Sequence, residues 1–127
     1  MTGPDPMPYV DGFLTPVPGD GYHAYMEFAR ISARVFREYG ALDQVECWGE
    51  DLPEGELTSF PRAVNAAEGE TVVLSFVLWP DRATRDAAME GVMNDPRISP
   101  RHVALPFDAR RMVFGGFDMV LGDLMTR

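Results

Sequence analysis

Two acidic side chains, Asp11 and Glu46, are candidates for proton chemistry. Each lies in a short stretch of β-branched and aromatic residues, where apolar surroundings can raise the pKa of a carboxyl enough for proton transfer near neutral pH. A structural interpretation stays open beside the catalytic one. In that interpretation each carboxylate bonds backbone amides or pairs with an arginine such as Arg62 or Arg111.

A second group of polar residues lies near the C-terminal end. Asp108 precedes the pair Arg110 and Arg111. The planar guanidinium of Arg111 can hold a carboxylate or another anion, whereas the structural alternative has Arg111 clamping a turn that Asp108 forms with backbone amides. His102, in a loop bounded by prolines, is either a proton carrier at the mouth of a pocket or an exposed loop residue.

Cys47 is the only cysteine, so the chain forms no internal disulfide. A thiol can act as a nucleophile, but the strand pattern places Cys47 beside Val45 on an apolar face, where a buried cysteine behaves as a small hydrophobe. The two histidines, His23 and His102, are not clustered with other ligand-type residues. We therefore expect neither a metal site nor a cofactor.

Side-chain alternation along the strands groups the aromatic and carboxylate residues on one face. We expect that face to point away from the helices, because the smaller, apolar set opposite it suits helix packing; a register slip of one residue would reverse the assignment. An aromatic concavity with a few carboxylates is typical of a small-molecule site and also of a dimer interface. The expected ligand contacts are Phe13, Trp48, Asp108 and Arg111, and the expected face carries Tyr9, Asp11, Phe13, Glu46, Trp48, Ser75 and Trp79.

The elements that position these residues follow the order β-α-β-β-α-β. This is the order of ferredoxin-like α+β folds, an antiparallel sheet of strand order 4-1-3-2 with two helices on one face. The first and second strands flank the third in this order, which separates Asp11 from Glu46 by about 9 to 10 Å of backbone. We expect strands at 9–17, 42–48, 71–79 and about 111–121 and helices at 22–39 and from about 82 to 94, and we leave 60–65 open as a short extra strand.

Length and charge exclude several classes of protein. The 127 residues predict one domain at 9–122, with an extended lead-in at 1–8 and a tail at 123–127. All 11 basic residues are arginines, so chemistry that needs a lysine, such as a Schiff base or a phosphate-loop lysine, is excluded. We expect a cytoplasmic protein that is not bound to a membrane, because no stretch resembles a signal peptide or a membrane helix.

The third strand indicates a partner. Residues 72–79 are apolar with hardly a polar interruption, as expected for a strand that is buried on both faces. Two helices cover only one face of the sheet, so a second copy of the chain is the economical cover for the other face. We therefore expect a two-fold homodimer whose sheets pack against each other as a barrel.

Several motifs occur in the order found in a known family. The chain resembles the YbaA-like family of small bacterial proteins, a domain of unknown function in the dimeric α+β barrel superfamily. The resemblance implies the dimeric barrel fold, and it allows cofactor-independent oxygenase- or isomerase-type chemistry in the cavity without establishing that the protein is an enzyme. It rests on Tyr9-Val10-Asp11-Gly12-Phe13, Val45-Glu46-Cys47-Trp48, Arg85-Asp86-Ala87-Ala88, Asn94-Asp95-Pro96-Arg97, Pro106-Phe107-Asp108 and Gly115-Gly116-Phe117.

Two functions follow as expectations. The first is an uncharacterised homodimeric α+β barrel that binds a small apolar or aromatic molecule in its cavity; the alternative is a non-catalytic dimer that serves protein interaction or regulation. Some members of the family carry a label that ties them to the RNA of the signal recognition particle. A net charge of −9 without any lysine argues against RNA binding here.

Overall fold

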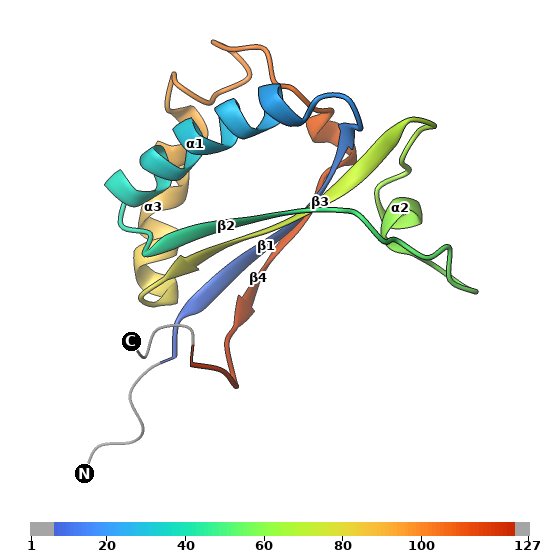
Figure 1. Ribbon diagram of the computed structural model, residues 1–127. Coiled ribbons are helices and arrows are strands. Elements are labelled where there is room, and N and C mark those ends of the chain that lie inside the picture. Colours follow the sequence, from blue (N-terminus) through green and yellow to red (C-terminus); the bar gives the residue numbers. More distant parts are fainter. Residues whose placement is uncertain (1–6, 124–127) are drawn as a thin grey trace.

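The protein is built from a four-stranded antiparallel sheet with two long helices on one face (Figure 1). The computed structural model describes residues 7–123, so most of the predicted lead-in and tail, residues 1–6 and 124–127, lies outside the described residues. The strands are β1 (Tyr9–Pro18), β2 (Asp43–Trp48), β3 (Glu70–Trp79) and β4 (Val113–Asp118). The helices are α1 (Tyr22–Glu38), α2 (Phe60–Ala63), α3 (Arg82–Asn94) and a 3-10 helix, η1 (Ala109–Arg111).

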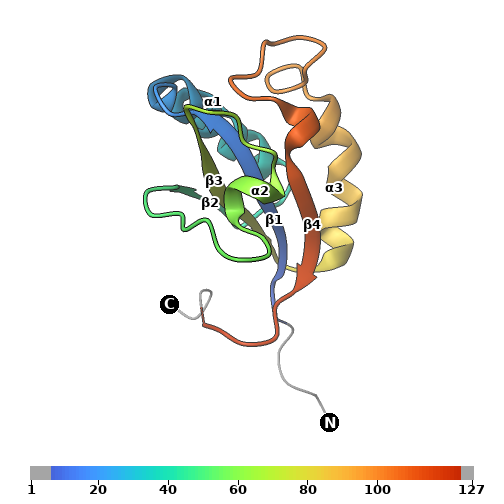
Figure 2. The same ribbon diagram turned by 90° about the vertical axis from the view of Figure 1, so that its right-hand side faces the viewer.

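The strands are arranged in the order β2-β3-β1-β4, which is the order 4-1-3-2 read from the other edge. The element order differs from the expected β-α-β-β-α-β because a short helix lies between β2 and β3, and residues 60–65, left open as an extra strand, form no strand. Ser59 accepts a hydrogen bond from the backbone N–H of Arg62, and Pro61 suits the first turn, so the segment forms the short helix α2. Figures 1 and 2 place α2 apart from α1 and α3, near the end of the sheet where β3 begins.

The two long helices begin and end for local reasons. α3 begins where the Asp81 side chain accepts from the Thr84 N–H. α1 begins at Tyr22, and Gly21 before it offers no side chain that could cap the helix. At its C-terminal end Gly40 has φ +112°, and the N–H groups of Gly40 and Ala41 bond the carbonyls of Arg37 and Phe36. This is a Schellman motif, which needs a left-handed residue at that position.

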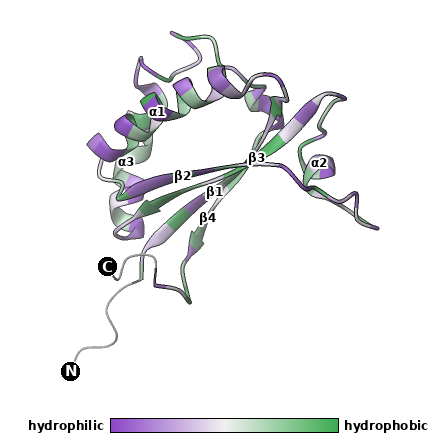
Figure 3. Ribbon diagram, viewed as in Figure 1, coloured by the Kyte–Doolittle hydropathy of each residue, from purple (hydrophilic) through white to green (hydrophobic). Residues whose placement is uncertain are grey.

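The core lies between the sheet and the long helices. α1 carries hydrophilic and hydrophobic residues around its circumference (Figure 3), and its buried side meets the sheet. Phe36 packs edge-on against Trp79 with ring centroids 5.9 Å apart. Trp79 is fully buried, and it belongs to a cluster with Val35, Phe36, Ala41, Val77, Ala88 and Val92.

The predicted grouping of strand residues by face holds, but its assignment to the outer face is wrong. Trp79 and Trp48 contact aromatic residues of α1, and Asp11 is bonded by Arg85 of α3. The carboxylates and aromatics therefore lie beneath the helices. The physical reason is volume, because long helices held above a sheet leave space that large side chains fill more completely than Val or Cys.

The opposite face of the sheet is apolar and partly open. Near the start of β3, where α2 contacts β1 and β3, Pro16 and Val72 of this face are buried. Farther along, Leu74 is 42% exposed and Phe117 is 60% exposed. We call this surface the open sheet face; its apolar residues, by register, are Val10, Leu14, Val45, Cys47, Leu74, Phe76, Leu78, Val113 and Phe117, and the half-exposed Asp43 lies at its β2 edge.

Within residues 7–123, no helix combines the length and the apolar character that a membrane span requires.

Candidate functional site

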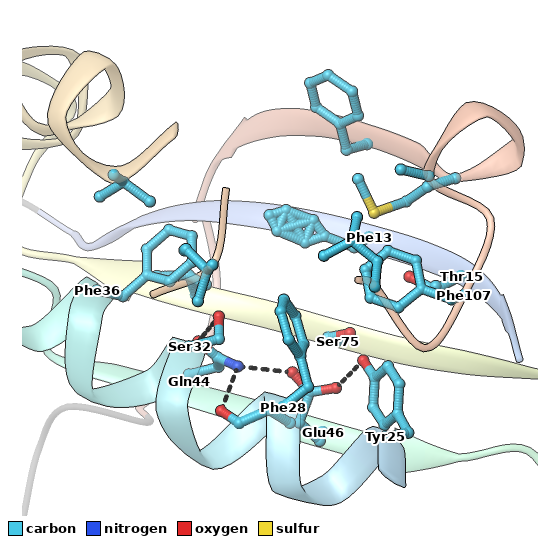
Figure 4. Close-up of a pocket in the computed structure, with 18 of the residues that line it drawn as sticks. Phe13, Thr15, Tyr25, Phe28, Ser32, Phe36, Gln44, Glu46, Ser75 and Phe107 are labelled. Atoms are coloured by element: carbon cyan, nitrogen blue, oxygen red, sulfur yellow. Dashed lines mark hydrogen bonds between the residues drawn. The ribbon is translucent and has the colours of Figure 1, made fainter. Parts of the chain in front are cut away.

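A pocket of about 200 Å³ lies between the helices and the sheet (Figure 4). Its floor comes from β1, β2 and β3, one wall from α1, another from α3, and the rest from the segment 98–114. Most of its surface is aromatic or aliphatic. The apolar lining comprises Phe13, Phe28, Ala29, Phe36, Val77, Met89, Val92, Met93, Ile98, Pro100, Leu105, Phe107, Ala109, Met112 and Phe114.

Glu46 is the charged residue of this lining. Its Oε1 accepts a hydrogen bond of 2.6 Å from the Tyr25 hydroxyl, and its Oε2 accepts one of 2.9 Å from Gln44 Nε2 (Figure 4). Both carboxylate oxygens therefore accept a hydrogen bond from a neutral donor of the chain. Glu46 lies on β2 directly opposite Ser75 of β3, so a carboxylate and a hydroxyl are side by side on the pocket floor.

Tyr25 holds its proton firmly. Burial raises the pKa of the Tyr25 phenol well above its usual value, and the adjacent negative charge of Glu46 raises it further. The hydroxyl is thus a fixed donor to Glu46. Tyr25 is itself held by rings on both sides, Trp48 of β2 at 6.2 Å and Phe107 at 6.0 Å between centroids.

Gln44 links the carboxylate to the helix. Besides Glu46, its amide group donates weakly to the carbonyl of Ala29 and accepts from the Ser32 hydroxyl, each at 3.4 Å. Because Ala29 and Ser32 lie on α1, this network ties the floor of the pocket to its wall. The position of Glu46 is therefore fixed before any molecule enters.

Asp11 lies outside this pocket. Its two oxygens bond Arg85 Nη2 at 2.9 Å and Arg85 Nε at 3.1 and 3.2 Å, and they also accept from Trp79 Nε1 at 2.9 Å. The guanidinium of Arg85 lies 5.2 Å from the centre of the Tyr9 ring. The structural interpretation of Asp11 holds, although its partner is Arg85 and neither Arg62 nor Arg111.

Asp108 and Arg111, both expected to contact a ligand, are engaged with each other and do not line the pocket. Asp108 caps η1 through the Arg110 N–H and accepts from Arg111 Nε at 3.0 Å. Arg111 also holds both oxygens of Glu70 at 2.7 and 2.8 Å. The fork of Arg111 is thus filled by two carboxylates of the chain itself, as the clamp interpretation predicts.

The remaining candidates divide between the pocket and the surface. Phe13 lines the pocket, whereas Trp48 supports it from behind Tyr25. His102 is exposed and is not part of the lining. Cys47 is exposed on the open sheet face, which corrects the expectation of a buried thiol. In the described part of the chain, no three residues of the His, Cys, Asp and Glu types are gathered where a metal could bind.

Sequence reasoning missed Tyr25 and Gln44 as partners of Glu46. The spacing of Tyr25 places it on the apolar side of the helix 22–39, yet tyrosine carries a hydroxyl that needs an acceptor when it is buried. Gln44 stands two residues before Glu46 and so on the same strand face. The hydroxyl of a buried tyrosine and the shared strand face of Gln44 and Glu46 are the sequence signals that could have identified these partners.

Fold and pocket together define a small α+β protein with a cavity between its helices and its antiparallel sheet. The profile of the family described as "Protein of unknown function (DUF1428)" matches residues 8–109. Over 117 residues, 92% of this chain and the whole of the relative, the chain is 45% identical to "Uncharacterized protein YbaA" of Escherichia coli (strain K12). A protein with that description from Shigella flexneri matches to the same extent. The chain belongs to this family of unknown function, as its motifs indicate.

Proposed function

We propose that this protein binds a small, largely apolar molecule in the pocket between its helices and its sheet. The observation that carries the proposal is the lining, in which aromatic and aliphatic walls surround a small polar cluster whose one charged group, Glu46, is already held in place. Pockets of this composition are the usual sites of small-molecule binding. A dry cavity of about 150 Å³ is large enough for benzene, so this one suits a single ring with a short substituent.

Toluene titration followed by NMR of the methionine methyl groups tests this function. Met89, Met93 and Met112 line the pocket, whereas Met26 and Met119 do not. We expect the first three methyl signals to shift at millimolar toluene and the other two to stay unchanged. Shifts of equal size at all five methyls, or none, would refute the proposal.

A blocking variant and a matched control sharpen this experiment. Met112→Trp enlarges a partly buried side chain that lines the pocket, and Met119→Trp makes the same change outside it. We expect the first variant to lose the toluene shifts at Met89 and Met93 and the second to keep them. Native mass spectrometry of the purified protein then identifies a ligand that copurifies with it from the cell.

We further propose that the molecule is a cytoplasmic homodimer whose two open sheet faces pack together, giving the dimeric ferredoxin-like barrel. Support comes from the character of that face, to which each of the four strands of the described chain contributes apolar side chains. A second copy is favoured over an unlike partner because most soluble assemblies are homo-oligomers with two-fold symmetry, in which one apolar patch covers its own copy.

Sedimentation of the purified protein at micromolar concentration tests the dimer. The expected mass is twice 14.1 kDa. Leu74→Arg places a charge in the open sheet face and should yield monomers, whereas Leu57→Arg, at a 95% exposed position outside that face, should not. The reactivity of Cys47, which lies opposite Leu74 in the register, is a second measure of the dimer. Its thiol should react faster with a disulfide reagent in the monomeric variant than in the wild type. A wild-type mass near 14 kDa would favour the other candidate, a surface for an unlike protein.

A further inference from the structure

The carboxylates of the chain are partnered in two different ways. Of those with a small exposed fraction, Asp11 is paired with Arg85, Asp95 with Arg97 and Glu70 with Arg111. Glu46 has no arginine partner within residues 7–123, and its hydrogen bonds come from the neutral groups of Tyr25 and Gln44. The chain thus supplies a cation wherever it encloses a carboxylate, except inside the pocket.

Neutral donors fix a carboxylate without cancelling its charge. Tyr25 and Gln44 each occupy one oxygen of Glu46, and a carboxylate offers about four lone-pair sites in all. The surrounding walls are apolar, and electrostatic attraction is stronger there than in water. No arginine, lysine or histidine of the described chain lines the pocket. The site therefore offers an incompletely satisfied negative charge in surroundings that lack any positive one.

A row of side chains runs across the sheet from this charge. In the register, Glu46 lies opposite Ser75, Ser75 lies opposite Phe13, and Phe13 lies opposite Phe114. All four line the pocket, and the two phenylalanine rings are 6.3 Å apart between centroids. The floor thus changes from a carboxylate and a hydroxyl at β2 and β3 to aromatic rings at β1 and β4. Strand spacing makes the distance from Glu46 to Phe13 about 10 Å along the floor.

We propose, building on the binding function above, that the pocket selects small apolar amines in their protonated form. The ammonium group donates to Glu46 and Ser75, and the apolar body lies on Phe13 and Phe114. An ammonium carries three donors and no acceptor, which matches a floor that offers acceptors. Aromatic rings also attract a cation electrostatically. Carboxylates and phosphates are rejected, because Glu46 repels them and no cation offsets the repulsion.

Four ligands of nearly equal shape test the charge preference by the same methyl NMR titration near neutral pH: benzylammonium, benzyl alcohol, toluene and benzoate. Benzylammonium should bind about tenfold more tightly than toluene, because a hydrogen bond to a charged group is worth roughly that factor. Benzyl alcohol should fall between them, and benzoate should bind more weakly than toluene.

Two variants that each remove one negative charge separate the site from the overall charge. Glu46→Gln removes the pocket carboxylate, and Glu27→Gln removes an exposed one on α1 that does not line the pocket. Glu46→Gln should abolish the preference for benzylammonium and leave toluene affinity within about twofold. Glu27→Gln should leave both affinities as they are. Toluene binding serves as the check that each variant is folded.

The outcomes distinguish this inference from the function on which it rests. If toluene binds and benzylammonium binds no more tightly, the amine preference is wrong and the apolar pocket stands. The same conclusion follows if Glu27→Gln lowers benzylammonium affinity as much as Glu46→Gln does. If none of the four compounds shifts the methyl signals of Met89 and Met112, both proposals fall.

Discussion

Asp11 and Glu46 occupy the same face of the same sheet, on the two strands that flank β3, yet their surroundings are opposite in kind. Asp11 is 3% exposed, and a guanidinium and an indole N–H fill both of its oxygens. Glu46 borders a cavity and is bonded by a phenol and an amide. One carboxylate has a complete set of charged and neutral partners, whereas the other has only neutral ones.

This difference separates a structural carboxylate from one that is available to a ligand. A buried ion pair is locked by its own geometry, and breaking it leaves a charge without solvent or partner. A carboxylate held by neutral donors keeps its place when a ligand arrives, and it still attracts a positive charge. The type of partner thus distinguishes the two roles, although both residues lie in the same strand pattern.

Removal of Asp11 should have the largest effect on stability. Asp11→Ala leaves the buried Trp79 N–H without its acceptor and the Arg85 guanidinium with only the more exposed Asp86 as partner, and the expected loss is about 3 kcal/mol of unfolding free energy. Urea denaturation measures it. Arg85 is the informative partner, since Asp11 raises the pKa of its guanidinium through their hydrogen bonds.

A double-mutant cycle with Arg85 provides the control. Because the two residues act as a pair, the double variant Asp11→Ala, Arg85→Met should cost clearly less than the sum of the two single changes. Toluene binding in Asp11→Asn should remain that of the wild type, since Asp11 does not line the pocket. Additive costs, or a weakened pocket in Asp11→Asn, would show that the two carboxylates are not separate in role.

The fold was largely predictable because its signals are local. The apolar spacing along α1, the Asp81 cap of α3 and the glycine at position 40 each act within a few residues of the chain. Alternation likewise grouped Asp11 with Phe13 and Glu46 with Trp48 correctly. Which face the helices cover was not predictable in this way, because it depends on the volume between layers, and both faces of these strands are apolar.

The site was predictable only in part. Phe13 and Glu46 line the pocket, whereas Asp108 and Arg111 pair with each other and with Glu70. The sequence shows which residues can form ion pairs, but the choice of partner depends on contacts between residues far apart in the chain. Asp11 meets Arg85 across 74 positions, a distance over which no spacing rule acts.

A smaller effect is expected at the Tyr25 and Glu46 pair, where no full ion pair is lost. Glu46→Leu leaves the Tyr25 hydroxyl and the Gln44 amide without their acceptor and should cost about 1 to 2 kcal/mol. The double variant Tyr25→Phe, Glu46→Leu should cost less than Glu46→Leu alone, because it also removes the unpaired hydroxyl. Urea denaturation of the three variants measures the coupling. A loss as large as that of Asp11→Ala would mean that Glu46 is as structural as Asp11.

The smallest effect is expected at Asp95, a buried carboxylate whose partner Arg97 is itself exposed to solvent. Hydrogen bonds from the Arg97 side chain lower its pKa from 3.8 to about 2, and Arg97 also lowers the pKa of Glu38 from 4.5. A depressed pKa in the folded state stabilises the protein above the unfolded value and is lost as the pH falls through the folded value. Arg97→Gln should therefore be less stable than the wild type near pH 7, and the difference should shrink from about pH 4.5 downward and vanish around pH 2.

Urea denaturation across this pH range measures the difference in unfolding free energy. Arg101→Gln is the matched control, because the side chain of Arg101 forms no ion pair in the described chain. A pH-independent difference would place the contribution of Arg97 in packing, and the contrast between charged and neutral partners would then rest on Asp11 alone.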